Sequence, residues 1–270
     1  MQLKEEKFSL SSFYRKRFDS FLIYLSAAKQ LKEEDIHRLR VDMKYIRSLM
    51  LLIDEFNLGA DVGTKLLKQL KSIYNSAGKL RACQVTKSLL LKSNVEIPSE
   101  ISVFLEDELS LMAEKFRNNL SRFDYPKFNK RVILLYSELD KVDTSELKIK
   151  VDSIIHDELE IINKLFNSSK GEEYHHEIRK LLKVIKSLQQ LLLAFKEDEN
   201  SRQALDIVNS TETLLGNWHD SKVLKDSLNR LDEEMTQTSI KRVLRNLKNQ
   251  NNKLRLELKN ESDKYLRNHF

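Results

Sequence analysis

The segment HRLRVDMKYIR, residues 37–47, recurs 139 positions later as HEIRKLLKVIK, residues 176–186. Both copies read His-x-x-basic-x-x-x-basic-x-x-basic. Within each copy the apolar residues are three or four positions apart, as they are on one face of an α-helix. The two segments therefore predict a pair of amphipathic helices with the same pattern of basic residues.

A second pair of segments has nearly the same offset. GKLRACQV, residues 78–85, matches GNWHDSKV, residues 216–223, at a distance of 138 positions. Two matches in the same order and at almost the same offset indicate an internal repeat. We therefore expect a single domain, residues 1–270, built from an N-terminal helical half of about residues 1–141 and a C-terminal helical half of about residues 142–270.

Helical periodicity continues through the rest of the chain. The 270 residues include only 5 glycines and 2 prolines, whereas a β-rich fold of this size needs many more turn residues. We predict an all-α fold of two pseudo-symmetric helical-bundle halves, about 10–11 helices in all, around a basic central groove. The expected helices span roughly residues 9–31, 34–56, 62–75, 77–93, 99–121, 125–140, 145–167, 172–197, 201–216, 218–231 and 236–268.

Composition suggests an intracellular protein. Cys83 is the only cysteine, so no internal disulfide can form, and a lone thiol fits a reducing compartment. The N-terminal stretch MQLKEEKFSL has no apolar segment of signal-peptide length. The apolar runs, such as residues 191–195, are too short to cross a bilayer. We therefore expect a cytoplasmic protein without a membrane partner, and the sequence makes no prediction about oligomeric state.

The basic residues of the repeated helix form a stripe beside its apolar face. With His37 at 0° on a helical wheel, Arg40, Lys44 and Arg47 fall at about 280–340°, and the apolar residues at about 120–240°. Arg179, Lys183 and Lys186 take the same angles behind His176, and Lys180 widens the band. The net charge is only +6, so this placement matters more than the total. A packed flank that carries such a stripe needs a row of acidic residues or an external anion to neutralise it.

These segments resemble the signature of the CHAD family, the conserved-histidine α-helical domain. In that family a His-x-x-Arg helix with further Arg and Lys recurs in each half. Residues 78–85 resemble its short segment centred on Arg-Asp, and LLGNWHD, residues 214–220, resembles its later Leu-Gly-x-x-x-Asp segment. The resemblance implies non-catalytic binding of inorganic polyphosphate in the central groove, association with polyphosphate granules, and no cofactor or metal.

Residues matched to this signature are the candidate polyphosphate ligands. The sequence departs from the family at Tyr45 and Lys186, where the family has Arg, and at Ala82, where it has Asp. The loss of two guanidinium groups bears on affinity, because Arg binds phosphate as a planar fork. The candidates are His37, Arg40, Lys44, Arg47, His176, Arg179, Lys180, Lys183 and Lys186, with Arg81 as a further candidate.

Three other functions remain open from the sequence. A metal-dependent HD-type phosphohydrolase is also helical and needs His and Asp residues that converge on a divalent metal. A nucleic-acid-binding protein would show similar phosphate contacts but usually adds aromatic stacking platforms, and the stripes contain only Tyr45. The third is a helical scaffold for a protein partner. The residues that suggest the HD-type site are the pair His219-Asp220, with His156, Asp157, His175 and His176 elsewhere.

Overall fold

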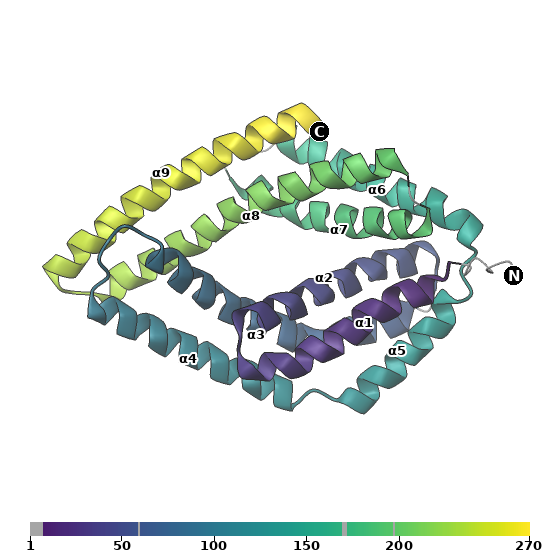
Figure 1. Ribbon diagram of the computed structural model, residues 1–270, viewed down its shortest axis with the longest axis horizontal. Helices are drawn as coiled ribbons and strands as arrows, with labels where there is room; N and C mark the ends of the chain where they lie inside the picture. Colours follow the sequence, from purple (N-terminus) through teal and green to yellow (C-terminus); the bar gives the residue numbers. More distant parts are fainter. Residues whose placement is uncertain (1–7, 59, 169–171, 197) are drawn as a thin grey trace, which may run out of the picture.

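The computed structural model describes residues 8–58, 60–168, 172–196 and 198–270 (Figure 1). Within these ranges the chain forms nine α-helices and one 3-10 helix, with no strand, which confirms the predicted all-α fold. The elements are α1 (Leu10–Ala27), η1 (Ala28–Gln30), α2 (Glu33–Glu55), α3 (Ala60–Leu91), α4 (Ser99–Ser121), α5 (Tyr125–Leu139), α6 (Thr144–Ser168), α7 (Glu173–Phe195), α8 (Glu199–Glu234) and α9 (Thr238–His269).

Part of the predicted organisation falls on residues that are not described. The expectation of no secretion signal was based on a stretch that includes residues 1–7. The helix expected at residues 172–197 was expected to end at Glu197. Residues 1–7 and Glu197 lie outside the described residues. None of the described helices combines the length and the apolarity that a bilayer crossing requires.

Two expected helix breaks are wrong. The sequence suggested one break at residues 75–78 and another at Gly216, but α3 and α8 run through both positions. A glycine inside a helix costs about 1 kcal/mol relative to alanine, which tertiary packing easily outweighs. Here α3 packs on α2 and α4, and α8 packs on α7 and α9, along most of their lengths. The described helices are therefore nine rather than about ten or eleven.

Other helix ends match the sequence. Asp124 caps α5 by accepting a hydrogen bond from the Lys127 backbone nitrogen at 2.9 Å. Asp198 caps α8 in the same way, from Ser201 at 2.9 Å. Such caps satisfy backbone N–H groups that have no partner within the helix. Short polar side chains thus fix where α5 and α8 begin.

Three apolar clusters hold the helices together. The largest joins α1, α2, α5 and the first part of α3, and it also includes Leu188, Leu191 and Leu192 from the end of α7. A second cluster joins the C-terminal ends of α3 and α8 to the N-terminal parts of α4 and α9. The third joins α6, α7, α8 and α9, and it contains Ile178 and Leu182 from the start of α7. Helix α7 is therefore buried in two cores, one at each end.

The two halves meet where α2 packs on α7 and α3 packs on α8 (Figure 1). The hydroxyl of Ser48 on α2 donates to that of Ser187 on α7, at 2.6 Å. These two serines occupy equivalent positions in the predicted repeat. Further along, the hydroxyls of Thr86 on α3 and Ser227 on α8 lie 3.0 Å apart. Small polar residues at these points allow the helices to approach closely.

Candidate polyanion-binding site

The basic stripes of α2 and α7 lie close to one another. We call Arg40, Lys44, Arg179, Lys183 and Lys186 the central cluster. Burial, together with the nearby charges of Arg179 and Arg40, lowers the pKa of Lys44 to about 8. Burial also lowers the pKa of Lys183 to about 6, aided by Arg179, Lys44 and Arg40. Because Coulomb repulsion fades with distance, these effects show that the two stripes face a shared space.

The two lysines at the middle of the stripes are not directly paired. Within the part of the chain that the structure describes, neither Lys44 nor Lys183 forms a hydrogen bond or an ion pair. Both side chains are only partly exposed. A partly desolvated ammonium group without an ion-pair partner is unfavourable, and the charge of Glu212 only partly offsets this, so the free protein releases protons here. Negative charge placed beside these lysines would favour their charged forms.

Arg40 owes its position to a glycine on the neighbouring helix. Its Nη1 donates to the Tyr74 carbonyl oxygen at 3.0 Å, and its guanidinium lies 4.9 Å from the centre of the Tyr74 ring. A Cβ atom placed on Gly78 would come within 2.7 Å of the same nitrogen. The guanidinium of Arg47 also lies over the Tyr74 ring, 5.1 Å from its centre. A larger residue at position 78 would therefore push the end of the Arg40 side chain out of its present place.

Arg179 has a similar but looser setting in the second half. A Cβ atom on Gly216 would lie 3.9 Å from its Nε and Nη2 atoms, an ordinary contact distance. The buried Nε atom has no hydrogen-bond partner among the described residues. Burial lowers the pKa of this guanidinium, while Glu212 and Asp220 act against that effect. Arg179 therefore has a donor available inside the cluster.

Acidic side chains neutralise only part of the positive charge. Glu212 on α8 forms an ion pair with Lys186, whose Nζ lies 2.9 Å from Glu212 Oε2. Burial alone would raise the pKa of Glu212, but the hydrogen bond from Lys186 and the charge of Lys183 hold it below its ordinary value. Asp220 also faces the cluster, since the charge of Arg179 counters the rise in its pKa that burial causes. These two carboxylates leave the cluster with excess positive charge.

Other predicted ligands lie at its edges. Arg81 on α3 pairs with Glu33 at 2.9 Å, and Lys180 pairs with Glu177 on the solvent side of α7. The structure thus brings Arg40, Lys44, Arg179, Lys183 and Lys186 together, and it places His37, Arg47, Arg81, His176 and Lys180 around them or outward from them.

The histidines at the start of the stripes have pKa values below that of a free imidazole. Burial lowers the pKa of His37, and the charges of Arg81 and Lys44 lower it further. Burial also lowers the pKa of His176, whose ring lies 5.4 Å from that of His219 on α8. His219 is the more strongly affected, with a pKa lowered to about 3 by burial and by the charge of Arg179. Neutral imidazole can still donate one N–H to an anion.

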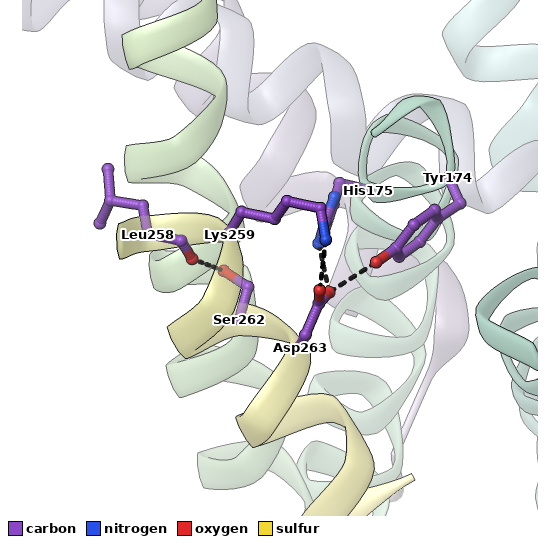
Figure 2. Close-up of polar contacts among 6 residues, drawn as sticks. All are labelled: Tyr174, His175, Leu258, Lys259, Ser262 and Asp263. Carbon is purple, nitrogen blue, oxygen red and sulfur yellow. Dashed lines mark hydrogen bonds and ion pairs between the residues drawn. The ribbon is translucent and has the colours of Figure 1, made fainter. Parts of the chain in front are cut away.

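A buried polar cluster fixes the first turn of α7 against α9 (Figure 2). The Tyr174 hydroxyl donates to Asp263 Oδ1 at 2.6 Å, and His175 Nε2 lies 2.8 Å from the same oxygen. Lys259 donates to the other carboxylate oxygen, also at 2.6 Å. His175 is 0 % exposed, and its ring packs on that of Trp218 at 4.8 Å. These contacts set the orientation of α7, which carries the second stripe.

The residues that suggested an HD-type metal site do not converge. His175 is bound to Asp263, whereas His176 faces His219, and Asp220 faces Arg179. Across the described ranges, no group of three or more His, Cys, Asp or Glu side chains is placed to hold a metal ion.

Sequence reasoning missed Tyr74 and Glu212, and it named His219 and Asp220 only for the HD-type alternative and not as polyanion ligands. A signal for the two missed residues was present, because Tyr74 and Glu212 are separated by 138 positions, the same offset as Gly78 and Gly216. Extending the repeat alignment by one helical turn would have placed both beside the stripes.

Comparison with known proteins supports the fold. A solved structure, PptA from Streptomyces chartreusis, superposes with a TM-score of 0.69 at 13% sequence identity, covering 96% of this chain and 98% of that chain. At this identity the likeness shows a common fold over nearly the whole of both chains. Models of protein families give no match to the sequence, and curated proteins give none.

Proposed function

We propose that this protein binds inorganic polyphosphate, without catalysis, in the central cluster between α2 and α7. The observation that carries the proposal is the pair Lys44 and Lys183, two partly buried amino groups from different helices that form no ion pair with a described residue and whose pKa values are lowered by burial and by neighbouring cations. The resemblance of both stripes to the CHAD signature supports the same ligand.

A linear polyanion matches the shape of the stripes. From His37 to Arg47 the helix axis advances about 15 Å, at roughly 1.5 Å per residue, so one stripe can contact several successive phosphates. The second stripe adds contacts to the same chain once the first is bound, because the effective local concentration is then high. Long chains should therefore bind much more tightly than tripolyphosphate.

The central test removes the two unpartnered charges. In the double variant Lys44→Gln, Lys183→Gln, we expect the affinity for long-chain polyphosphate to fall by at least about tenfold, since two desolvated contacts are lost. Folding should survive, because glutamine is a good helix former and two like charges are removed. The matched control is Lys253→Gln, Lys264→Gln, which removes two exposed lysines of α9.

Affinity is measured by titration calorimetry at fixed salt, after circular dichroism has verified the helical content of both proteins. Equal losses in the cluster variant and the control would mean that binding is diffuse electrostatic attraction, and the proposed site would be wrong. A salt series adds a second criterion. By analogy with single-stranded nucleic acids, the log–log slope should be roughly −0.7 for each phosphate that is neutralised.

Association with polyphosphate granules is part of the proposal. A fluorescent fusion of the intact chain should co-localise with granules in polyphosphate-accumulating cells, and the double variant should be diffuse. Persistent granule localisation of the double variant would assign recruitment to another surface.

A further inference from the structure

Helix α3 presents positive charge on two flanks. Its sequence has six basic residues and one acidic residue, Asp61, which pairs with Lys65 in the first turns of the helix. One flank of α3, with Tyr74, Gly78 and Arg81, faces α2 and the central cluster. The other flank faces α4 and α5, and the central cluster does not account for its lysines.

This second flank lines an outer trough, formed by two adjoining pockets of about 410 and 610 Å³ that share Ser72, Asn119 and Arg122. Volumes of this size suit a small ligand. The larger pocket has five cationic side chains, and its single carboxylate is that of Asp124. The cations are Lys65, Lys68, Arg122, Lys127 and Arg131.

The single carboxylate is already engaged. Asp124 caps α5 by accepting from the Lys127 backbone nitrogen, so its charge is directed toward the helix end. By contrast, the side chains of Lys68, Arg122 and Lys127 form no ion pair with any residue in the described ranges. The trough therefore has uncompensated positive charge close to a helix N-terminus.

Hydrogen bonds hold the floor of the trough in place. Arg131 Nη1 donates to the Lys65 carbonyl oxygen at 2.9 Å and to Gln69 Oε1 at 2.6 Å. Gln69 Nε2 in turn donates to the Asp124 carbonyl oxygen at 2.7 Å. This network ties α3 to the start of α5. Part of the ordering cost of binding is thus already met by the fold.

Amide and hydroxyl groups distinguish the trough from the central cluster. Asn75, Asn118, Asn119 and Ser72 line it alongside the cations. Asparagine offers a carbonyl acceptor as well as N–H donors, so it can also bind a ligand that has donors of its own. The interior of an inorganic polyphosphate chain has only acceptors, whereas the hydroxyls of a sugar or polyol phosphate have both.

We propose that the outer trough between α3, α4 and α5 is a second anion site, specific for a small phosphate ester with free hydroxyl groups. Its cations bind the phosphates, and its asparagine and serine side chains bind the hydroxyls. The site lies on the opposite flank of α3 from the central cluster, so it does not depend on polyphosphate binding.

The test uses the full chain with the central cluster disabled by Lys44→Gln and Lys183→Gln. The probes are inositol 1,4,5-trisphosphate and inorganic tripolyphosphate, which have three phosphates each and differ in hydroxyl content. In titration calorimetry at low salt we expect one site for the trisphosphate, and weaker binding of tripolyphosphate.

Adding the three changes Lys68→Gln, Arg122→Gln and Lys127→Gln should then lower trisphosphate affinity by at least about tenfold, because three exposed charge contacts are lost. All three side chains are exposed, so the fold should be retained. The control replaces three exposed lysines outside the trough, Lys29, Lys253 and Lys264, with glutamine and should change the affinity less than about twofold.

Three results would overturn the proposal: loss of trisphosphate binding when only the central cluster is disabled, equal affinities in the trough variant and the control, or tripolyphosphate binding as tight as that of the trisphosphate. None of them bears on the affinity of long polyphosphate for the central cluster, so failure here is distinct from failure of the proposed function.

Discussion

Binding of polyphosphate should be accompanied by uptake of protons, chiefly at Lys183. The pKa values of about 6 for Lys183 and about 8 for Lys44 follow from burial and from repulsion within the central cluster. At pH 7.5 these values leave about 3 % of Lys183 and about three quarters of Lys44 protonated. A bound polyanion removes the repulsion and favours the ammonium forms. Full protonation on binding then takes up about 1.0 proton at Lys183 and about 0.2 at Lys44.

The sign of the pH dependence follows directly. Because the complex binds more protons than the free protein, affinity must fall as pH rises. An uptake of about 1.2 protons near pH 7.5 corresponds to a loss of affinity of about fifteenfold for each pH unit. The effect should extend from below pH 7 to the pH at which the bound lysines themselves lose their protons.

Calorimetry in buffers of different ionisation enthalpy measures the uptake as the slope of binding enthalpy against buffer enthalpy. In Lys183→Gln the uptake at pH 7.5 should fall to about 0.2, whereas the exposed-lysine variant Lys253→Gln should keep the original value. An uptake close to zero in the unmodified protein, or one that Lys183→Gln leaves unchanged, would refute the account of the two lysines.

The other predictions concern positions that shape the site. Gly78→Ala should lower polyphosphate affinity, because the added Cβ would come within 2.7 Å of Arg40 Nη1 and displace that guanidinium. Gly216→Ala, whose added Cβ has its nearest contact at 3.9 Å, should change affinity little. Direct titration of both variants checks this. Glu212→Gln removes the counter-charge of the central cluster and should raise affinity several-fold; an unchanged affinity would contradict the assigned charge balance. Asp263→Asn should destabilise the fold by about 2–4 kcal/mol in urea unfolding, since it disrupts a buried charged network, whereas the exposed Glu261→Gln should be close to neutral. The pKa of Asp263 lies below its ordinary value, so the stability that it contributes is present above its unfolded pKa and is lost as pH falls toward the folded value; acid unfolding of Asp263→Asn should lack that component.

Local patterns in the sequence were sufficient for the fold class and for the composition of the stripes. Periodicity identified α2 and α7 because one face of each is apolar, and the angles of Lys44 and Lys183 on those helices followed from the helical repeat. The two glycines were misinterpreted. Gly78 has the low helix propensity that suggests a break, yet it lies within α3, where the Arg40 guanidinium occupies the space beside it. That contact is tertiary and has no local signature.

The rest of the site depends on contacts between helices that are distant in sequence. Glu212 neutralises Lys186 from another helix, and no periodicity within α7 reveals it. The outer trough is likewise assembled from α3, α4 and the start of α5. Its lysines on α3 alone resemble an ordinary solvated face. Only the packing of Arg122 and Lys127 against that face shows that the charges share one pocket.

The burial of α7 in two cores bears on any attempt to divide the chain. A polypeptide that ended near residue 141 would lack Leu188, Leu191 and Leu192, which are 0–8 % exposed in the cluster formed mainly by the first half. Full burial of each leucine is worth about 1.5–3 kcal/mol, so the isolated piece would display an uncovered apolar strip and tend to self-associate. The matching C-terminal piece would carry those leucines without their partners. Limited proteolysis between α5 and α6 should therefore leave a nicked protein whose fragments stay together and separate only when the whole assembly unfolds.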